Sequence, residues 1–124
     1  MEKSETKQFK VVFKDSVNDY DTLFGGIALK WMDEVAYITA TRFCRKNVVT
    51  ILTEKVQFLK PVPYGAIVEI IGKIRNFGHV KIEVKVELFT ESMYNNSREK
   101  AVTGIFHFAS VNEKNKPQRL FTEN

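Results

Sequence analysis

The sequence predicts an α+β domain in which a curved antiparallel sheet wraps around one long central helix. The prediction rests on the order of the patterns along the chain: one strand, one long apolar segment with helical periodicity, and then four strands joined by short turns. Consecutive strands pair antiparallel, and the helix must cover one face of their sheet. One helix cannot cover every strand, so we expect the sheet to pair with a second copy of the chain.

Length and composition favour a single domain. The chain has 124 residues, near the usual size of one hydrophobic core, and its 44% hydrophobic and 27% charged residues are typical of a globular protein. We expect one domain over residues 1–124, with a core at about 9–111 and a polar tail at 112–124. The chain has no apolar run that could cross a bilayer and no signal-peptide pattern at its start. We therefore expect a cytoplasmic protein that does not associate with a membrane.

The net charge of +4 favours a polyanionic partner, but the strands argue against nucleic acid. Basic and acidic residues alternate along 80–89, which is typical of a solvated strand face rather than a stripe that follows phosphates. Two distant histidines and one cysteine provide no metal-ligand spacing, and no glycine-rich phosphate loop leads from a strand into a helix. We expect neither a metal nor another cofactor.

A strand and a loop are predicted before the helix. Apolar residues recur with period two in residues 8–14 (Phe9, Val11 and Phe13), which predicts a half-buried strand with these side chains inward. Residues 15–25 are rich in Asp, Asn and Gly, as a structured loop would be.

The helix is predicted from Gly26 to about Cys44, a stretch without proline. Apolar residues recur there at helical spacing, with alanines beside them: Ile27, Trp31, Val35 and Ile38. The glycine pair or Thr22 would begin the helix, and the arginines near its end suit the negative pole of the helix dipole.

Four strand patterns follow the helix. Residues 48–60 are β-branched at their start and are stopped by prolines, and 66–76 carry an apolar face. Residues 80–89 alternate almost without exception, with Val80, Ile82, Val84, Val86 and Leu88 inward. Residues 99–111 are apolar on both faces, as expected of a strand covered on both sides.

Three motifs occur in a specific order: NDYDTLFGG at 18–26, KWMDEVA at 30–36 and FLKPV at 58–62. In order and spacing they resemble the hotdog-fold acyl-CoA thioesterases of the acyl-CoA hydrolase group, over about residues 9–111. The resemblance implies hydrolysis of acyl-CoA to free fatty acid and CoA. It also implies homodimers, with active sites at the dimer interface, that assemble into a hexamer as a trimer of dimers.

The resemblance assigns the site to Asn18 of the loop, the Gly25–Gly26 turn and Asp33 of the helix. The chain departs from the family pattern in two places. The fourth loop residue, often glycine in the family, is Asp21. In the later hairpin, where relatives read Gly-Arg-Thr-Ser or similar, the chain reads Gly-His-Val-Lys over 78–81, which puts the hydroxyl contact to the CoA arm in question.

The chemistry of these residues fits thioester hydrolysis. Backbone N–H groups at a helix N-terminus are unpaired, so those of Gly25 and Gly26 would polarise the thioester carbonyl, and the Asn18 amide would donate a further hydrogen bond or hold the water. Asp33 would act as general base on water, with a pKa raised by burial, or alternatively as a nucleophile. Asp33 lies roughly 10 Å beyond Gly26 along the helix. A shared carbonyl therefore requires Asp33 from a partner across a two-fold axis.

Each residue also has a structural interpretation. An aspartate in a helix is commonly solvated or ion-paired, with Lys30 in reach, and an asparagine before a helix is commonly a turn residue. Glu34 is better explained by pairing with Lys30 than by catalysis. Cys44 is not expected to be a nucleophile, because the negative end of the helix dipole disfavours its thiolate. His107 is expected to be a core or interface histidine.

Further residues are assigned to substrate binding. The cations would meet the CoA phosphates and the aromatic residues would line the acyl pocket; the set is Phe24, Arg45, Lys46, Phe58, Lys60, Gly78 and Lys81. Two alternative functions stay open: a non-catalytic hotdog module that binds acyl-CoA, and a small basic β-domain that binds nucleic acid. The second alternative predicts a steep salt dependence of binding.

Overall fold

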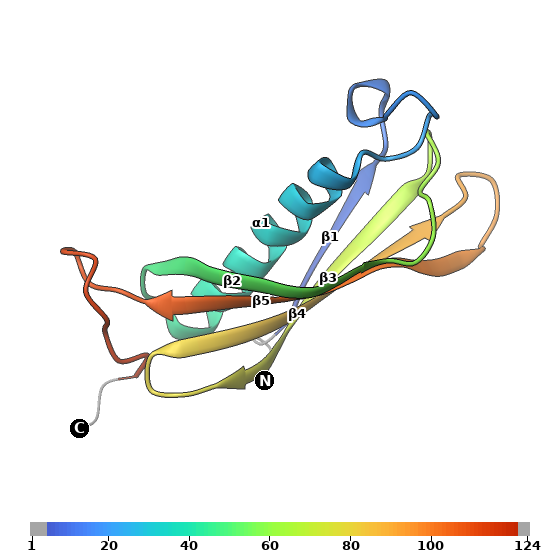
Figure 1. The fold of residues 1–124 in the computed structure, drawn as a ribbon. Coiled ribbons are helices and arrows are strands. Elements are labelled where there is room, and N and C mark those ends of the chain that lie inside the picture. The colour runs from blue at the N-terminus through green and yellow to red at the C-terminus, as the bar shows by residue number, and fades with distance from the viewer. Residues whose placement is uncertain (1–4, 122–124) are drawn as a thin grey trace.

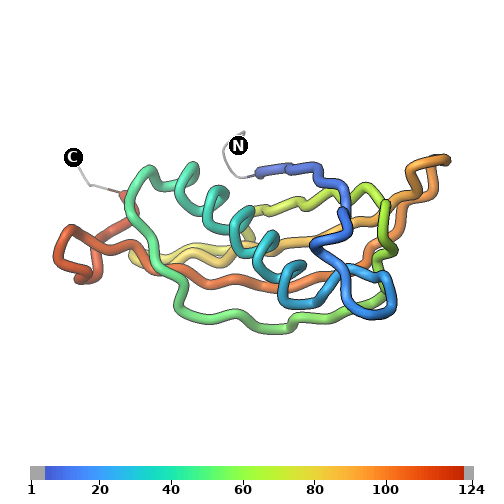
Figure 2. The backbone as a smooth tube through the Cα atoms, turned by 90° about the horizontal axis from the view of Figure 1, so that it is seen from above, coloured from blue at the N-terminus to red at the C-terminus, as the bar shows by residue number. Residues whose placement is uncertain are grey.

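The computed structural model describes residues 5–121 as one long helix on a five-stranded antiparallel sheet (Figure 1). The sheet order is β1-β3-β4-β5-β2, so β1 and β2 form its two edges. Seen from above, the helix lies along one face of the sheet (Figure 2). The elements are β1 (Glu5–Val11), the short 3-10 helix η2 (Lys14–Ser16), α1 (Gly25–Cys44), β2 (Val48–Phe58), β3 (Ile67–Phe77), β4 (Lys81–Glu91) and β5 (Arg98–Ser110). The predicted α+β architecture with one central helix is confirmed.

The alternation along β4 builds the centre of the core. Ile82, Val84, Val86 and Leu88 are fully buried beneath α1, whereas the residues between them face the other side of the sheet. β4 is the middle strand and pairs along its length with β3 and β5. Four of the five residues predicted inward are therefore correct, because alternation in a central strand leaves only one way to bury the apolar face. The fifth, Val80, precedes β4 and is only half-buried.

α1 packs closely against β3 at Gly72. A Cβ atom at this glycine would lie 2.6 Å from Thr39 Oγ1 and 3.0 Å from Val35 Cγ1. The Thr39 hydroxyl donates a hydrogen bond to the Val35 carbonyl at 2.7 Å, so this buried polar group is satisfied within the helix. The absence of a side chain on β3 therefore lets the helix lie directly on the sheet.

β1 presents a different face to α1 from the predicted one. Phe9, expected inward, is 60% exposed, while Thr6 is buried. Arg42 of α1 donates hydrogen bonds to the Glu5 carbonyl and the Thr6 hydroxyl, both at 3.1 Å. The prediction failed because the flank of the helix next to this edge strand carries an arginine, which selects polar partners over apolar ones.

The core extends beyond the predicted limits of 9 and 111. Leu120 is 1% exposed and its N–H donates to the His79 carbonyl at 2.8 Å. The Phe121 ring lies 5.4 Å from that of Phe43, at the C-terminal end of α1. Residues 112–121 thus fold back over this end of the helix instead of forming a loose polar tail, and 122–124 lie outside the described residues.

β2 leaves apolar side chains exposed at one edge of the sheet. Val49, Ile51 and Leu52 are 44%, 48% and 51% exposed. Two register shifts interrupt the pairing of β2 with β5, and Lys55, within the second of them, has a φ of 54°. An exposed apolar edge favours pairing with another chain, in line with the expectation of a second copy.

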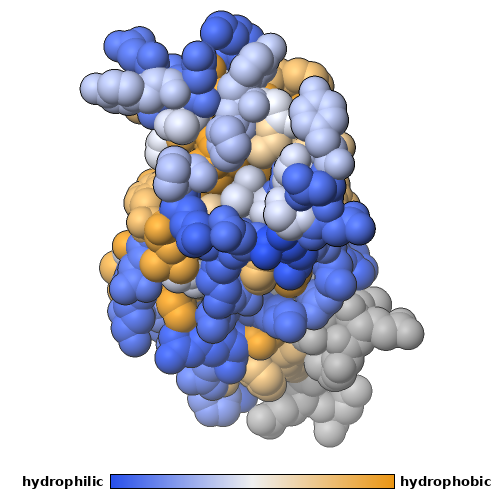
Figure 3. Space-filling model, turned by 90° about the vertical axis from the view of Figure 1, so that its right-hand side faces the viewer, coloured by the Kyte–Doolittle hydropathy of each residue, from blue (hydrophilic) through white to orange (hydrophobic). Residues whose placement is uncertain are grey.

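Charged side chains on the sheet face away from α1 pair with one another. Glu69 accepts a hydrogen bond from Arg98 at 2.7 Å, Glu87 pairs with Lys100 at 2.6 Å, and His107 joins Glu54 of β2 at 2.5 Å. Figure 3, which views the side where the β4–β5 loop projects, shows hydrophilic side chains over much of the surface with apolar patches between them. Within residues 5–121, no helix combines the length and apolar character needed to cross a membrane.

Candidate active site

Asn18 organises the loop that leads into α1. Its Oδ1 accepts hydrogen bonds from the N–H groups of Tyr20 and Thr22 at 2.9 and 3.2 Å and from the Thr22 hydroxyl at 3.1 Å. The amide nitrogen of the same side chain has no partner within residues 5–121. The oxygen thus holds the loop while the Nδ2 group remains able to donate to a ligand, so the turn role and the binding role are compatible.

Asp21 keeps the backbone conformation that glycine would favour. Its φ is 59°, in the left-handed region that Asp tolerates better than most residues. Its carboxylate lies 3.1 Å from Lys14 Nζ, and both side chains are exposed. The departure from the family pattern at this position therefore preserves the turn.

The N-terminus of α1 offers two unpaired donors. Phe24 is the N-cap residue and makes no side-chain cap. The N–H groups of Ile27 and Ala28 both donate to the Phe24 carbonyl at 3.0 Å, whereas those of Gly25 and Gly26 have no partner among the described residues. These two N–H groups lie at the positive end of the helix dipole, so they suit an oxygen that gains negative charge.

An apolar pocket of about 300 Å³ opens beside Gly25. It brings together three predicted site residues, Gly25, Phe58 and Lys60, with Leu23, Val62 and Val102 among its other walls. Phe24 lies next to it in sequence and is 54% exposed. Lys60 pairs with Glu99 at 3.0 Å, so its charge is already matched by a carboxylate.

Asp33 lies in the middle of α1 without a hydrogen-bond partner in the described chain. Its Oδ1 is buried, and burial, followed by the nearby charge of Glu34, raises the pKa of its carboxyl group. It borders a groove of about 510 Å³ that residues of α1, among them Tyr37 and Ile38, form with Gln8 of β1. The expected ion pair of Lys30 with Glu34 is not formed within residues 5–121.

The glycine N–H groups and the Asp33 carboxylate do not meet within one chain. Gly26 and Asp33 lie on one stripe of α1, because seven residues make almost two full turns, and they are about 10 Å apart along the axis. The pocket at Gly25 and the groove at Asp33 share no lining residue. The structure therefore places the polarising donors and the carboxylate at two separate positions of the same helix.

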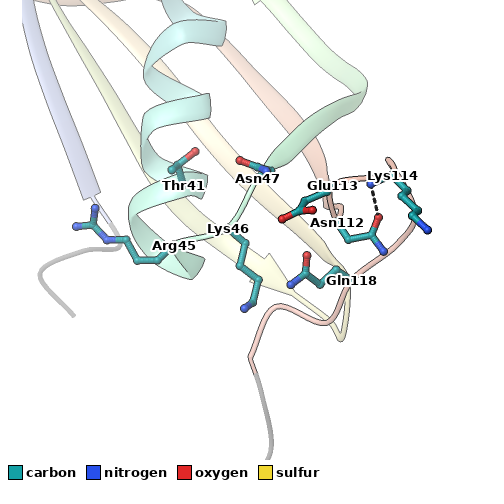
Figure 4. Close-up of a pocket in the computed structure, with 8 residues that line it drawn as sticks. All are labelled: Thr41, Arg45, Lys46, Asn47, Asn112, Glu113, Lys114 and Gln118. Carbon is teal, nitrogen blue, oxygen red and sulfur yellow. Dashed lines mark hydrogen bonds between the residues drawn. The ribbon is translucent and has the colours of Figure 1, made fainter.

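Four predicted substrate residues lie at the opposite end of α1, roughly 30 Å from Gly25. Arg45 is the C-cap residue, and Lys46 borders a polar groove of about 770 Å³ between the helix end and residues 112–118. In Figure 4 the Arg45 side chain points away from this groove, and Lys46 extends toward Gln118. Gly78 and Lys81 close the β3–β4 hairpin through a 2.9 Å backbone hydrogen bond. Within one chain these four residues therefore lie far from the glycine turn, and their contact with the substrate stays a prediction.

The cysteine and the histidines stay outside the site. Cys44 is buried at the end of α1 with its Sγ 4.0 Å from the Lys46 carbonyl. His107 pairs with the Glu54 carboxylate on the sheet face away from α1, and its side chain is 15% exposed. No cluster of three potential metal ligands occurs within residues 5–121.

Known proteins resemble this chain in sequence and in structure. An uncharacterized acyl-CoA thioester hydrolase of Bacillus subtilis is 34% identical over 125 residues, which cover 94% of this chain and 73% of the relative. The acyl-CoA hydrolase of Staphylococcus aureus, solved with butyryl-CoA, CoA and CoA disulfide, superposes with a TM-score of 0.90 at 30% identity, covering 96% of this chain and 73% of that one. An apo hexameric acyl-CoA thioesterase gives a TM-score of 0.92 at 28% identity, over 95% and 76%. The chain spans a quarter of the rat cytosolic acyl coenzyme A thioester hydrolase, which it also matches.

The Staphylococcus aureus hydrolase has also been solved as three variants, with alanine replacing an asparagine, an aspartate or a threonine. The asparagine and the aspartate are 15 positions apart, as Asn18 and Asp33 are, and the threonine follows the aspartate by 17 positions, as Thr50 does. Thr50 was not among the predicted site residues; its only signal in the sequence is a polar residue within the apolar run VVTIL. It pairs with the buried Phe108, whose ring meets Tyr37 of α1, so it lies on the helix-bearing face of the sheet.

The comparisons agree with the motif resemblance and with the fold. Residues 20–95, which include the second half of the loop, the whole of α1 and the strands β2, β3 and β4, match the thioesterase superfamily. The structural neighbours share the arrangement of one long helix on a curved five-stranded sheet over nearly the whole chain. The chain therefore belongs to the thioesterase superfamily and has the hotdog fold.

Proposed function

We propose that the protein hydrolyses acyl-CoA thioesters to a free carboxylic acid and CoA, in a site that two copies of the chain build together. One observation carries the proposal: α1 holds two unpaired N–H groups beside an apolar pocket and, two turns further along the same stripe, a half-buried carboxylate with a raised pKa and no partner in the described chain. The named activity of the relatives supports the same substrate class.

The helix N-terminus polarises the thioester in this mechanism. The carbonyl oxygen accepts hydrogen bonds from the N–H groups of Gly25 and Gly26, with the free amide of Asn18 as a third donor. The acyl chain then lies in the pocket beside Gly25. Because these donors are fixed before the substrate arrives, they stabilise the negative charge that develops on the oxygen in the transition state.

Asp33 of the partner subunit supplies the base. It accepts a proton from water while the water oxygen attacks the carbonyl carbon, the C–S bond breaks, and the same proton passes to the departing sulfur of CoA. The raised pKa brings the carboxyl group closer to neutral pH, where a general base is most effective. In the alternative, the carboxylate attacks the carbonyl carbon and forms an anhydride that water opens.

A two-fold axis near the midpoint between Gly26 and Asp33 fits both half-sites. With the two helices antiparallel about such an axis, Asp33 of each subunit faces Gly26 of the other. The exposed apolar edge at β2 supports pairing of two copies, and the hexameric relative supports further assembly of dimers into a hexamer. Thr50, on this edge strand, adds a hydroxyl group on the helix-bearing side of the sheet.

Release of CoA from acyl-CoAs of graded length tests the proposal. We expect turnover by the wild type and a loss of kcat of about a hundredfold or more in Asp33→Asn. Asn18→Ala should also lose activity, whereas Asp19→Asn, which changes an exposed loop carboxylate, should not. Binding without turnover would indicate a module that only binds acyl-CoA, and full activity of a folded Asp33→Asn would remove the base from the mechanism.

A further inference from the structure

We infer that Tyr37 is a positioning residue for the Asp33 base: its ring covers one oxygen of the carboxylate and leaves the other open to water. The inference rests on the proposed function, in which Asp33 accepts the proton. Both residues border the same groove, together with Glu34 and Ile38 of α1 and Gln8 of β1. The ring and the carboxylate therefore face one hollow of the surface.

The two oxygens of Asp33 have different surroundings. Oδ1 is buried without a hydrogen-bond partner and Oδ2 is not, although the residue as a whole is only half-buried. No ion pair or hydrogen bond holds the carboxylate within residues 5–121. The cover over Oδ1 is therefore apolar, because it excludes water without offering a donor.

Helix geometry places the Tyr37 ring over this carboxylate. Tyr37 follows Asp33 by four residues, so their Cβ atoms are about 5–6 Å apart on one face of α1. A long side chain on a helix points back toward the N-terminus and covers the preceding turn, which here is the turn of Asp33. The Tyr37 hydroxyl has no hydrogen-bond partner within residues 5–121. The ring, and not the hydroxyl group, is thus the part of Tyr37 that acts on Asp33.

Phe108 of β5 holds the Tyr37 ring in place. The two ring centroids are 6.5 Å apart and the planes meet at 64°, an edge-to-face contact. Phe108 is fully buried, so it provides a fixed surface, and its cross-strand neighbour Thr50 lies on the same face of the sheet. The ring therefore occupies a defined position between the Asp33 carboxylate and the sheet.

Few charged groups surround Asp33 within the described chain. Burial is the larger cause of its raised pKa, and the charge of the neighbouring Glu34 is the second. Lys30, one turn earlier, is exposed and forms no ion pair within residues 5–121, and β1 presents only the uncharged Gln8 to the groove. A change at Tyr37 leaves these groups in place, so it alters the burial of Asp33 alone.

Carbon-13 NMR of the Asp33 carboxyl group tests the inference on the assembled protein. The chain has four aspartates, so selective labelling of aspartate gives four carboxyl signals, and the one missing from Asp33→Asn belongs to Asp33. Tyr37→Ala should lower the pKa of Asp33 toward its ordinary 3.8, whereas Tyr37→Phe, which keeps the ring, should retain the pKa. Ile38→Ala is the matched control: it borders the same groove and is 40% exposed, against 46% for Tyr37, and it should leave this pKa unchanged.

The pH dependence of hydrolysis gives the functional readout. A carboxylate of lower pKa is a weaker base, so Tyr37→Ala should shift the acidic limb of kcat/KM to lower pH and reduce the plateau of kcat about threefold to tenfold. Tyr37→Phe should match the wild type in both respects. A lowered Asp33 pKa in Tyr37→Ala, found together with no hydrolysis by the wild type, would contradict the proposed function and support the cover by the ring. An unchanged Asp33 pKa in Tyr37→Ala, or an equal fall in Tyr37→Phe, would overturn the inference.

Discussion

Mixing two inactive variants tests whether the site is shared between subunits. Asn18→Ala disables the half-site at the N-terminus of α1, and Asp33→Asn disables the carboxylate half-site. If each site takes Asn18 from one subunit and Asp33 from the other, a dimer of one chain of each kind contains one fully native site and one doubly altered site. The two variants should therefore complement each other.

The expected recovery follows from the geometry. Gly26 and Asp33 are about 10 Å apart along one helix, too far to contact one carbonyl together, so within one chain the site is incomplete. Random assembly makes about half of the dimers mixed, and each mixed dimer has one native site of two. The mixture should regain about a quarter of the wild-type activity, and a higher assembly of dimers does not change this fraction.

The assay is CoA release after co-expression, or after joint unfolding and refolding, of the two variants. Each variant refolded alone provides the background, and a mixture of Asp33→Asn with the double variant Asn18→Ala/Asp33→Asn provides the control, since no dimer in it has a native site. Activity of the test mixture no greater than the sum of the separate variants would refute the shared site and the two-fold arrangement derived from it.

Three further predictions concern single positions. Gly25→Pro removes one N–H donor at the first position of α1, where proline is tolerated, and the preceding residue Phe24 already has the extended conformation that proline requires (φ −65°, ψ 131°). The kcat for acetyl-CoA should fall about a hundredfold while the melting temperature stays unchanged. Gly25→Ala keeps the N–H group and should not show this loss. Gly72→Ala forces a Cβ atom to within 2.6 Å of Thr39 Oγ1 and should lower the free energy of unfolding by about 1–3 kcal/mol in a urea titration, while Gly78→Ala, with no atom near the added carbon, should change little. Because burial raises the pKa of Asp33 above its ordinary 3.8, the folded state binds more protons and stability falls as pH rises through that window. Asp33→Asn should therefore be more stable than the wild type at neutral pH, with the difference narrowing toward acidic pH; a variant that is less stable at neutral pH would contradict this sign.

The helix and the central strands were predictable because each of their hydrophobic patterns allows only one face to be buried. Alternation in β4 and the proline-free apolar stretch of α1 each define a buried face that a core can accept. The edge strand β1 was different. The apolar residues of β1 alternate as well, but Arg42 of α1 bonds to β1 and the opposite face of the strand is buried. Arg42 and β1 are distant in the sequence and come together only in the folded chain.

The candidate site also has residues that the sequence could predict and residues that it could not. Asn18, the glycine turn and Asp33 could be named because the motifs that carry them are local in sequence, and the separation of Gly26 from Asp33 follows from helix geometry alone. The position of Arg45 and Lys81 at the far end of α1 from Gly25 was not predictable, because charge identifies a cation but not the end of the molecule where it lies. Thr50, to which the spacing of the Staphylococcus aureus variants points, was not named from the sequence, since a single threonine in an apolar strand has no local pattern.

The sequence by itself determined the architecture, the order of the elements, the glycine turn at the start of the helix and the charged residue in its middle. Local periodicity and turn chemistry suffice for these features, since they depend on neighbours within a few residues. Only the tertiary structure decided that the helix rests on Gly72, that the Phe58 ring lies next to Gly25, and that the two glycine N–H groups border an apolar pocket. These features depend on contacts between residues distant in the chain, which packing of the whole domain creates.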